Sequence, residues 1–229
     1  MQLLKQRGIL IFWAVLLLDC YCIYSNNHEY RLFTKTLLVP LIGFFIFLNA
    51  RRNAYPTTKT LLFFALIAAW IGDILLLNNG STSFLLGMGC FFIFHVLIGI
   101  VFYRLKKLNL EKCQEAFLAL IVFIVAAIAL LKFLKYSLPH EMKVPVIIYM
   151  VGLAFMLIMV ANQMSNSFRR INTLSFFLPA AALFIGSDGI LVVSKYRFDD
   201  IPFLDVVVML SYGYALALLG QGFTKMFKG

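Results

Sequence analysis

The sequence predicts an all-α fold, a polytopic membrane protein with eight transmembrane helices in one bundle. Hydrophobic residues make up 62% of the 229-residue chain and charged residues only 13%, with a mean hydropathy of +0.93. Soluble domains are about one quarter charged, so this composition excludes a soluble domain. Eight apolar segments follow one another, each close to the roughly 20 residues that cross a bilayer as a helix. Short connections separate them, and we therefore expect a single transmembrane domain over residues 1–229.

The eight segments are expected at residues 8–25, 33–49, 60–77, 83–103, 116–134, 145–163, 171–193 and 203–223. The first follows Lys5 and Arg7, as the apolar part of a signal peptide does, but no small-x-small cleavage site ends it, so we expect a retained helix. From the second segment on, every segment except the fifth carries a candidate functional residue. In chain order these residues are Lys35, Asp73, His95, Tyr149, Asp188 and Tyr212.

The 20 Lys and Arg residues are distributed unevenly over the two sides of the predicted bundle. An even number of spans puts both termini on one side, and that side carries thirteen of them against seven on the other. Cytoplasmic loops are enriched in Lys and Arg, so the sequence predicts a multi-pass protein with both termini cytoplasmic. Topology and contact with anionic lipid thereby explain the net charge of +10, and we expect no nucleic-acid partner.

Two carboxylates lie inside apolar segments, Asp73 in the third and Asp188 in the seventh. An acidic side chain at such a position costs several kcal/mol, so it is expected to have a task or a partner. The stretch Ile71-Gly72-Asp73-Ile74-Leu75 resembles Gly186-Ser187-Asp188-Gly189-Ile190-Leu191, and the third and seventh helices run in the same direction. This similarity fits a parallel repeat of four helices plus four. Chance similarity between short apolar stretches is the alternative.

Position along the helices places other polar groups near these carboxylates. At a rise of 1.5 Å per residue, Lys35 and Tyr149 fall in the same layer as the two carboxylates, and His95 and Tyr212 fall deeper. The sequence predicts one cavity, open to the non-cytoplasmic side, in which the two carboxylates come within direct or one-water contact. Asp199, Asp200 and Asp205, near Lys195 and Arg197, are expected in a solvated loop.

Each candidate also has a structural interpretation. Lys35 can extend to the membrane interface, and His95 can form a neutral hydrogen bond between helices. The two carboxylates can form a structural pair, either with each other or with Lys35. Tyrosines in membrane helices also serve as packing residues or interface anchors, an interpretation that applies to Tyr149, Tyr212 and Tyr214.

The ordered combination of these residues resembles the YhhN family of membrane lysoplasmalogenases. The resemblance covers most of the chain and rests on Lys35 with Pro40, Gly72-Asp73-Ile74-Leu75-Leu76, Phe84-x-x-Gly87-x-x-x-Phe91-x-x-x-His95, Tyr149, Ser187-Asp188 and Ser211-Tyr212-Gly213-Tyr214-Ala215. The chain departs from the family pattern at Thr36, where proline is usual, and at Leu216, where glutamine is common.

The resemblance implies eight helices and a membrane lysophospholipid substrate, whose vinyl ether is hydrolysed to a fatty aldehyde and a glycerophospho-alcohol. Protonation of the alkene carbon gives an oxocarbenium ion, to which water adds. This reaction needs a proton donor beside a negative charge, and two carboxylates that share one proton supply both. Such a pair acts as a unit, so the sequence does not assign the acid. The expected catalytic residues are Asp73, Asp188 and His95, and the expected substrate-binding residues are Lys35, Tyr149, Ser187, Tyr212 and Tyr214.

No metal or organic cofactor is expected, because the chemistry requires none. The four cysteines lack the spacing of a disulfide framework or a metal site and are expected to pack in the core; they are Cys20, Cys22, Cys90 and Cys113. Two other functions remain open. A proton-coupled transporter would use the same buried acids to carry protons, and a non-catalytic lipid-binding protein would keep the cavity without the chemistry. The head-group preference and the oligomeric state are likewise open.

Overall fold

The structure is a computed structural model that describes residues 2–51, 55–78, 80–108, 114–198 and 201–228. The described residues form helices and no strand. The helices are α1 (Gln2–Tyr24), α2 (His28–Asn49), α3 (Pro56–Leu75), α4 (Ser81–Leu105), α5 (Gln114–Phe133), α6 (His140–Asn162), α7 (Ser167–Asn172), α8 (Leu178–Arg197) and α9 (Pro202–Lys228). A 3₁₀ turn, η2 (Gln163–Ser165), precedes α7, and a π-helical turn, η3 (Thr173–Phe177), joins α7 to α8.

Eight of the described helical stretches are long and apolar enough to cross a membrane, the seventh being α7, η3 and α8 together. This confirms the prediction of a polytopic all-α protein with eight spans. The predicted segments lie inside the observed helices except at a few ends. The helix α2 begins at His28 rather than residue 33, because a polar first turn precedes its apolar part.

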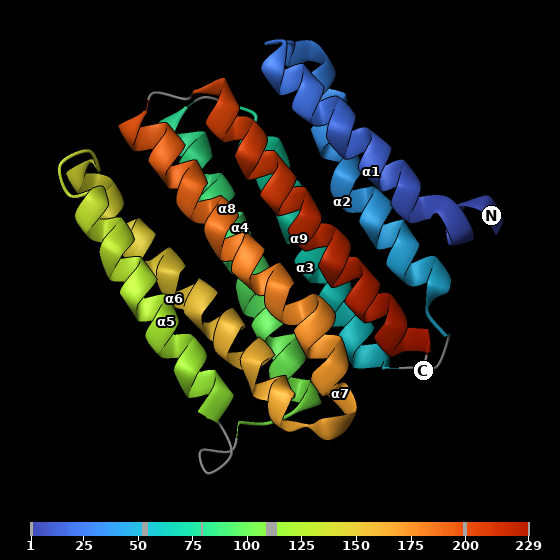
Figure 1. Cartoon of the computed structure of the whole chain (residues 1–229). Coiled ribbons are helices and arrows are strands. Elements are labelled where there is room, and N and C mark those ends of the chain that lie inside the picture. Colours follow the sequence, from blue (N-terminus) through green and yellow to red (C-terminus); the bar gives the residue numbers. More distant parts are fainter. Residues whose placement is uncertain (1, 52–54, 79, 109–113, 199–200, 229) are drawn as a thin grey trace.

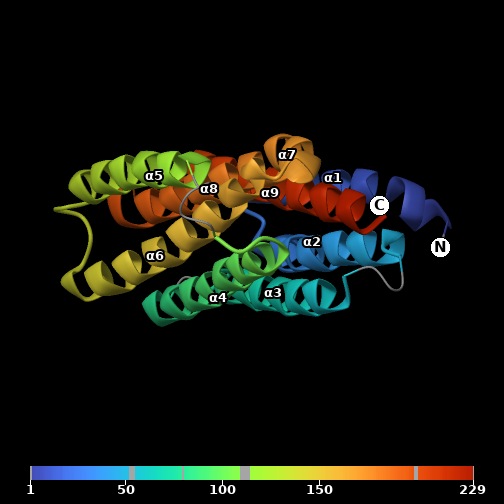
Figure 2. The same cartoon turned by 90° about the horizontal axis from the view of Figure 1, so that it is seen from below.

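The spans form two layers (Figure 2). One layer contains α5, α8, α9 and α1, and the other contains α6, α4, α3 and α2. Contacts of α1 with α2, α2 with α9, α6 with α8 and α5 with α6 join the layers. Both termini lie at one end of the bundle, and the connections α1–α2, α3–α4, α5–α6 and α8–α9 lie at the other (Figure 1).

A proline in α2 ties this helix to α3. Pro40 has no N–H, so the carbonyl of Thr36, four residues earlier, loses its helical donor. The indole Nε1–H of Trp70 in α3 donates to this Thr36 oxygen across 2.9 Å. The hydrogen bond satisfies a backbone group that would otherwise be unpaired in the membrane. It fixes α2 beside α3 close to the site, because Thr36 directly follows Lys35 and Trp70 is three residues before Asp73.

Glycines allow α3 and α4 to approach closely. A Cβ on Gly72 would lie 2.8 Å from the Phe91 ring, and a Cβ on Gly87 would lie 2.9 Å from the Leu76 side chain. Small residues at helix contacts are typical of membrane bundles. Since Gly72 directly precedes Asp73, this close contact also fixes the height and direction of that carboxylate.

Aromatic side chains fill the half of the bundle nearer the termini. Phe102, Phe177, Phe223 and Phe227 are almost completely buried, and neighbouring rings among them lie 4.8–5.8 Å apart. Above them, Phe94 and Phe184 pack at 5.3 Å. This aromatic column closes the interior below the two carboxylates.

Candidate functional site

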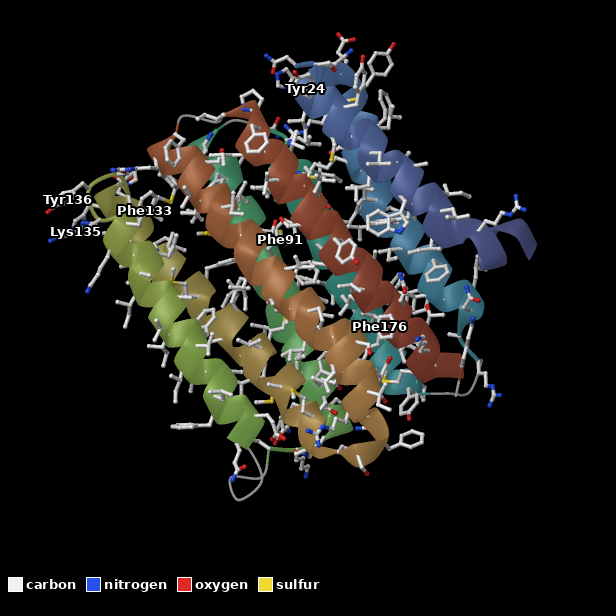
Figure 3. All side chains as sticks on the ribbon, viewed as in Figure 1. Tyr24, Phe91, Phe133, Lys135, Tyr136 and Phe176 are labelled. Carbon is white, nitrogen blue, oxygen red and sulfur yellow. The ribbon has the colours of Figure 1, made fainter. Side chains whose placement is uncertain are left out.

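A polar cavity of about 270 Å³ occupies the half of the bundle opposite the termini. Asn26 and Asn78 from the connections and His28 and Pro202, the first residues of α2 and α9, line its mouth, so it opens at the end away from the termini (Figure 1). Its deeper wall contains both Asp73 and Asp188. Phe91, also in the wall, lies in the middle of the bundle, whereas Tyr24 marks the outer end (Figure 3). One cavity is therefore lined by both carboxylates together with Lys35 and Tyr212, whereas His95 and Tyr149 are not among its lining residues.

The first carboxylate, Asp73 of α3, is buried and bonded from two other helices. The Tyr212 hydroxyl of α9 donates to Asp73 Oδ2 at 2.8 Å. The ammonium of Lys35 in α2 lies 3.9 Å from Oδ1. Lys35 is only 5% exposed, so it does not extend to the membrane interface. An ammonium and a phenol O–H both stabilise the carboxylate form of Asp73.

The second carboxylate, Asp188 of α8, is bonded by groups of a different kind. The Tyr149 hydroxyl of α6 donates to Asp188 Oδ2 at 2.7 Å. His95 Nε2 of α4 lies 3.1 Å from the same oxygen and 3.1 Å from the Tyr149 oxygen. The other ring nitrogen, Nδ1, faces the Met156 sulfur at 3.2 Å. One proton can thus lie between Asp188 and His95, on the carboxyl group or on the imidazole.

Each carboxylate and its hydrogen-bond or ion-pair partners form a group, and the two groups occupy helices that correspond in a repeat of four helices plus four. Counting spans, the third span carries Asp73 and receives contacts from the second and eighth; the seventh carries Asp188 and receives contacts from the sixth and fourth. A parallel repeat of four helices plus four pairs these spans one to one, with Lys35 matching Tyr149 and Tyr212 matching His95. The scaffold is thus alike on both sides while the chemistry differs, a cation beside one carboxylate and an imidazole beside the other.

The imidazole of His95 and the hydroxyl of Tyr212 reach the carboxylates, although the residue count places these two residues deeper in their helices. Their long side chains bring the imidazole and the hydroxyl up to the two carboxylates. Ser187 also lines the polar cavity, but its hydroxyl donates to the Val208 carbonyl at 3.0 Å and so joins α8 to α9. Direct or one-water contact between the two carboxylates stays a prediction.

Tyr214 was expected to bind the substrate, but it does not line the polar cavity. Residues two apart on a helix point about 200° apart, so Tyr214 points away from the side where Tyr212 binds Asp73. Its side chain is 48% exposed, and its ring lies 5.4 Å from Trp13 of α1. Tyr214 is therefore a packing residue on the outer surface.

Three charged residues near the site were not predicted. Arg31 lines the polar cavity one helical turn nearer its mouth than Lys35, and its buried Nε has no hydrogen-bond partner. Asp19 of α1 is completely buried and accepts a hydrogen bond from Thr34 at 2.5 Å. Asp205 is in the first turn of α9, not in a loop, where it lines the cavity and accepts from Ser194. Asp199 and Asp200 lie outside the described residues.

Sequence signals exist for two of them. Arg31 is four residues before Lys35 and thus on the same helix face, and Asp19 interrupts an apolar run as Asp73 and Asp188 do. Of the cysteines, Cys20, Cys22 and Cys90 carry free thiols, and Cys113 lies outside the described residues. Within the described part of the chain, no three His, Cys, Asp or Glu side chains are grouped in a way that could hold a metal ion.

Comparison with known proteins identifies the family. Searches among curated proteins and among solved structures gave no match. The sequence model of the YhhN family matches residues 30–223, which is most of the chain and includes every residue of the two carboxylate groups. The protein therefore belongs to the YhhN family.

Proposed function

We propose that the protein is a lysoplasmalogenase-like hydrolase, which cleaves the vinyl ether bond of alkenyl lysoglycerophospholipids. The products are a fatty aldehyde and a glycerophospho-alcohol. One observation carries the proposal: two carboxylates with different partners line the same cavity. Asp188 can share a proton with the His95 imidazole, and Asp73 lies beside the Lys35 ammonium. Acid-catalysed hydrolysis of a vinyl ether needs these two functions together, a proton donor and a fixed negative charge.

We infer different roles for the two carboxylates from their surroundings. Asp188 serves as the proton donor in this proposal, because its Oδ2 lies 3.1 Å from His95 Nε2, within reach of a proton transfer, and its side chain is 13% exposed, so it reaches the cavity. Asp73 is the fixed negative charge, because Lys35 and Tyr212 stabilise its carboxylate form. Tyr149 orients Asp188 by donating to the oxygen that also faces His95.

The reaction then runs in three steps. Asp188 gives its proton to the alkene carbon that does not bear oxygen, and the neighbouring carbon becomes part of an oxocarbenium ion next to the negative charge of Asp73. Water adds to this carbon and returns a proton to the Asp188–His95 pair. The resulting hemiacetal loses its glycerol oxygen, which leaves as the alcohol with a proton, and the aldehyde remains.

Positive charge near the mouth suits the phosphate of such a lipid. Arg31 and Lys195 line the outer part of the polar cavity. Arginine forms bidentate hydrogen bonds to phosphate, and Arg31 has a buried Nε without a hydrogen-bond partner in the empty cavity. Lys35, in contrast, lies beside Asp73. We therefore assign the phosphate contact to Arg31 and keep Lys35 as the partner of Asp73.

The test is incubation of the purified protein with an alkenyl lysophospholipid, followed by detection of fatty aldehyde. The matched control substrate is the saturated alkyl-ether analogue, which has no alkene carbon to protonate. We expect aldehyde from the first lipid and none from the second. Proton movement across protein-containing liposomes without any aldehyde would favour the transporter instead. The aromatic column that closes the cavity toward the termini supports the hydrolase.

A further inference from the structure

An apolar groove runs along the outside of the bundle between α5, α6 and α8. Its upper part has a volume of about 400 Å³, and in this part only Tyr149 and Asp188 contribute polar side chains. Its lower part has a volume of about 380 Å³. The two parts share Phe123, Ala126 and Ile185 in their walls, so they adjoin one another along α5 and α8. We call it the α5 groove.

The α5 groove reaches the proposed proton donor. Asp188 lines both the polar cavity and the upper end of the groove. A small cavity of about 20 Å³ lies between them: it shares Phe91 and Leu191 with the polar cavity and Met88 and Val192 with the groove. A polar compartment and an apolar compartment thus meet at one carboxylate.

The loose packing of α5 leaves the α5 groove accessible from the bilayer. On α5, only Ala116 and Phe123 are buried among the described residues, and the helix lies at the edge of the bundle (Figure 1). On the opposite wall, a Cβ at Gly186 would meet nothing within 4 Å. The groove therefore has free width beside Asp188.

We infer that the α5 groove holds the hydrocarbon chain of the substrate lipid. This inference rests on the proposed function and adds the position of the substrate. With the phosphate near Arg31 and the chain in the groove, the vinyl ether at the junction lies against Asp188. The groove extends at least from Asp188 to Leu178, which is about 15 Å along α8 at 1.5 Å per residue. Holding the chain fixes the alkene carbon near the donor, a main source of rate enhancement.

Filling the groove is the direct test. Gly186→Leu and Ala127→Leu place side chains into it from its two walls, α8 and α5. The matched control is Gly43→Leu. Gly43 lines a groove of about 410 Å³ between α2 and α3, which is similarly apolar but touches neither carboxylate. All three substitutions add the same side chain at a groove wall within a helix.

The first readout is the ratio of kcat/KM for hexadecenyl and octenyl lysophospholipids. We expect Gly186→Leu and Ala127→Leu to lower this ratio by at least about tenfold, the size of effect that a few methylene contacts have in an apolar pocket. Gly43→Leu should leave it at the wild-type value. A wild-type ratio in both groove variants, with aldehyde still released, would overturn the inference while leaving the proposed function intact.

The second readout does not need turnover. A saturated alkyl-ether lysophospholipid with a diazirine in the middle of its chain is photocrosslinked to the protein in lipid nanodiscs, with and without excess unlabelled analogue. We expect competable labelling in peptides of α5 and α8, lost in Gly186→Leu and kept in Gly43→Leu. Labelling that is not competable, or that is equal in the α2–α3 groove, would overturn the inference. Competable labelling without aldehyde release would support the groove and count against the proposed function.

Discussion

At the scale of single residues, the two carboxylates differ in their hydrogen-bond partners more than in their positions. Asp73 has an ammonium and a phenol beside it, and Asp188 has a phenol and an imidazole. Each partner comes from a different helix, so the bundle itself holds the groups in place. The proposed division into a proton donor and a fixed charge follows from these contacts.

Replacing either carboxylate by its amide should remove most of the activity. Asp188→Asn loses the proton donor and Asp73→Asn loses the negative charge, so each should lower kcat by about 10²–10⁴-fold, the usual worth of general acid catalysis. The double variant should be little worse than either single one, because the two act as a unit. The rate of aldehyde release at saturating substrate measures kcat for each variant. Tyr214→Phe, on the outer surface, is the control, and wild-type rates in both single Asn variants would exclude the mechanism.

Arg31 and Lys35 should affect different kinetic constants. Arg31→Gln should raise KM by about 10–100-fold with kcat nearly unchanged, because hydrogen bonds to charged groups contribute roughly 1.5–3 kcal/mol. Lys35→Met should instead lower kcat, since Asp73 would lose its cation. Arg197→Gln is the control, because Arg197 donates to Ser137 at the outer surface. An unchanged KM in Arg31→Gln would contradict the phosphate contact.

At the scale of helices, one physical reason lies behind both the spans and the candidate site residues that the sequence predicted. A charge inside an apolar run is costly, so Lys35, Asp73 and Asp188 were recognisable. Each has a partner on another helix, and Lys35 and Asp73 are buried while Asp188 is 13% exposed. The direction of side chains was harder. Tyr214 follows the motif of Tyr212 but points to the outside. Arg31 lies in the polar first turns of α2, before the apolar part from which the sequence predicts this span, so it was not predicted to line the cavity.

The close contact of α3 and α4 gives a prediction for stability. A Cβ added by Gly72→Ala would lie 2.8 Å from the Phe91 ring, so the helices must separate or the ring must move. Overpacking of this kind typically costs about 1–3 kcal/mol in the free energy of unfolding. Unfolding by SDS in mixed micelles measures the loss. Gly43→Ala, whose nearest contact would be an ordinary 3.6 Å, should cost little, and equal stability of the two variants would contradict the packing argument.

At the scale of the whole molecule, the cavity opens at the end opposite the termini, so orientation decides which side receives the polar products. The side of the bundle that holds the termini carries the excess of Lys and Arg, which predicts that the termini are cytoplasmic. The cavity would then open to the non-cytoplasmic side. The connections at Asn79 and Asn109 are suitable for labelling but lie outside the described residues, whereas Tyr136 and Phe168 are 87% and 92% exposed at opposite ends.

Single cysteines at these two positions, Tyr136→Cys and Phe168→Cys, test the orientation in a background without the four native cysteines. Tyr136 lies in the α5–α6 connection at the end away from the termini (Figure 3), and Phe168 lies in α7 at the other end. An impermeant maleimide added to intact cells should label the first variant at once and the second only after permeabilisation. The reverse pattern would place the cavity mouth in the cytoplasm.

The central claim is that the protein transfers a proton to carbon, and isotope incorporation tests it most directly. Hydrolysis of an alkenyl lysophospholipid in D₂O, with immediate reduction of the aldehyde to the alcohol to prevent later exchange, is followed by mass spectrometry. The account predicts one deuterium on the carbon next to the former carbonyl, at a rate that falls in Asp188→Asn and Asp73→Asn alike. Aldehyde without deuterium at this carbon, or deuterated aldehyde formed at the wild-type rate by both variants, would contradict it.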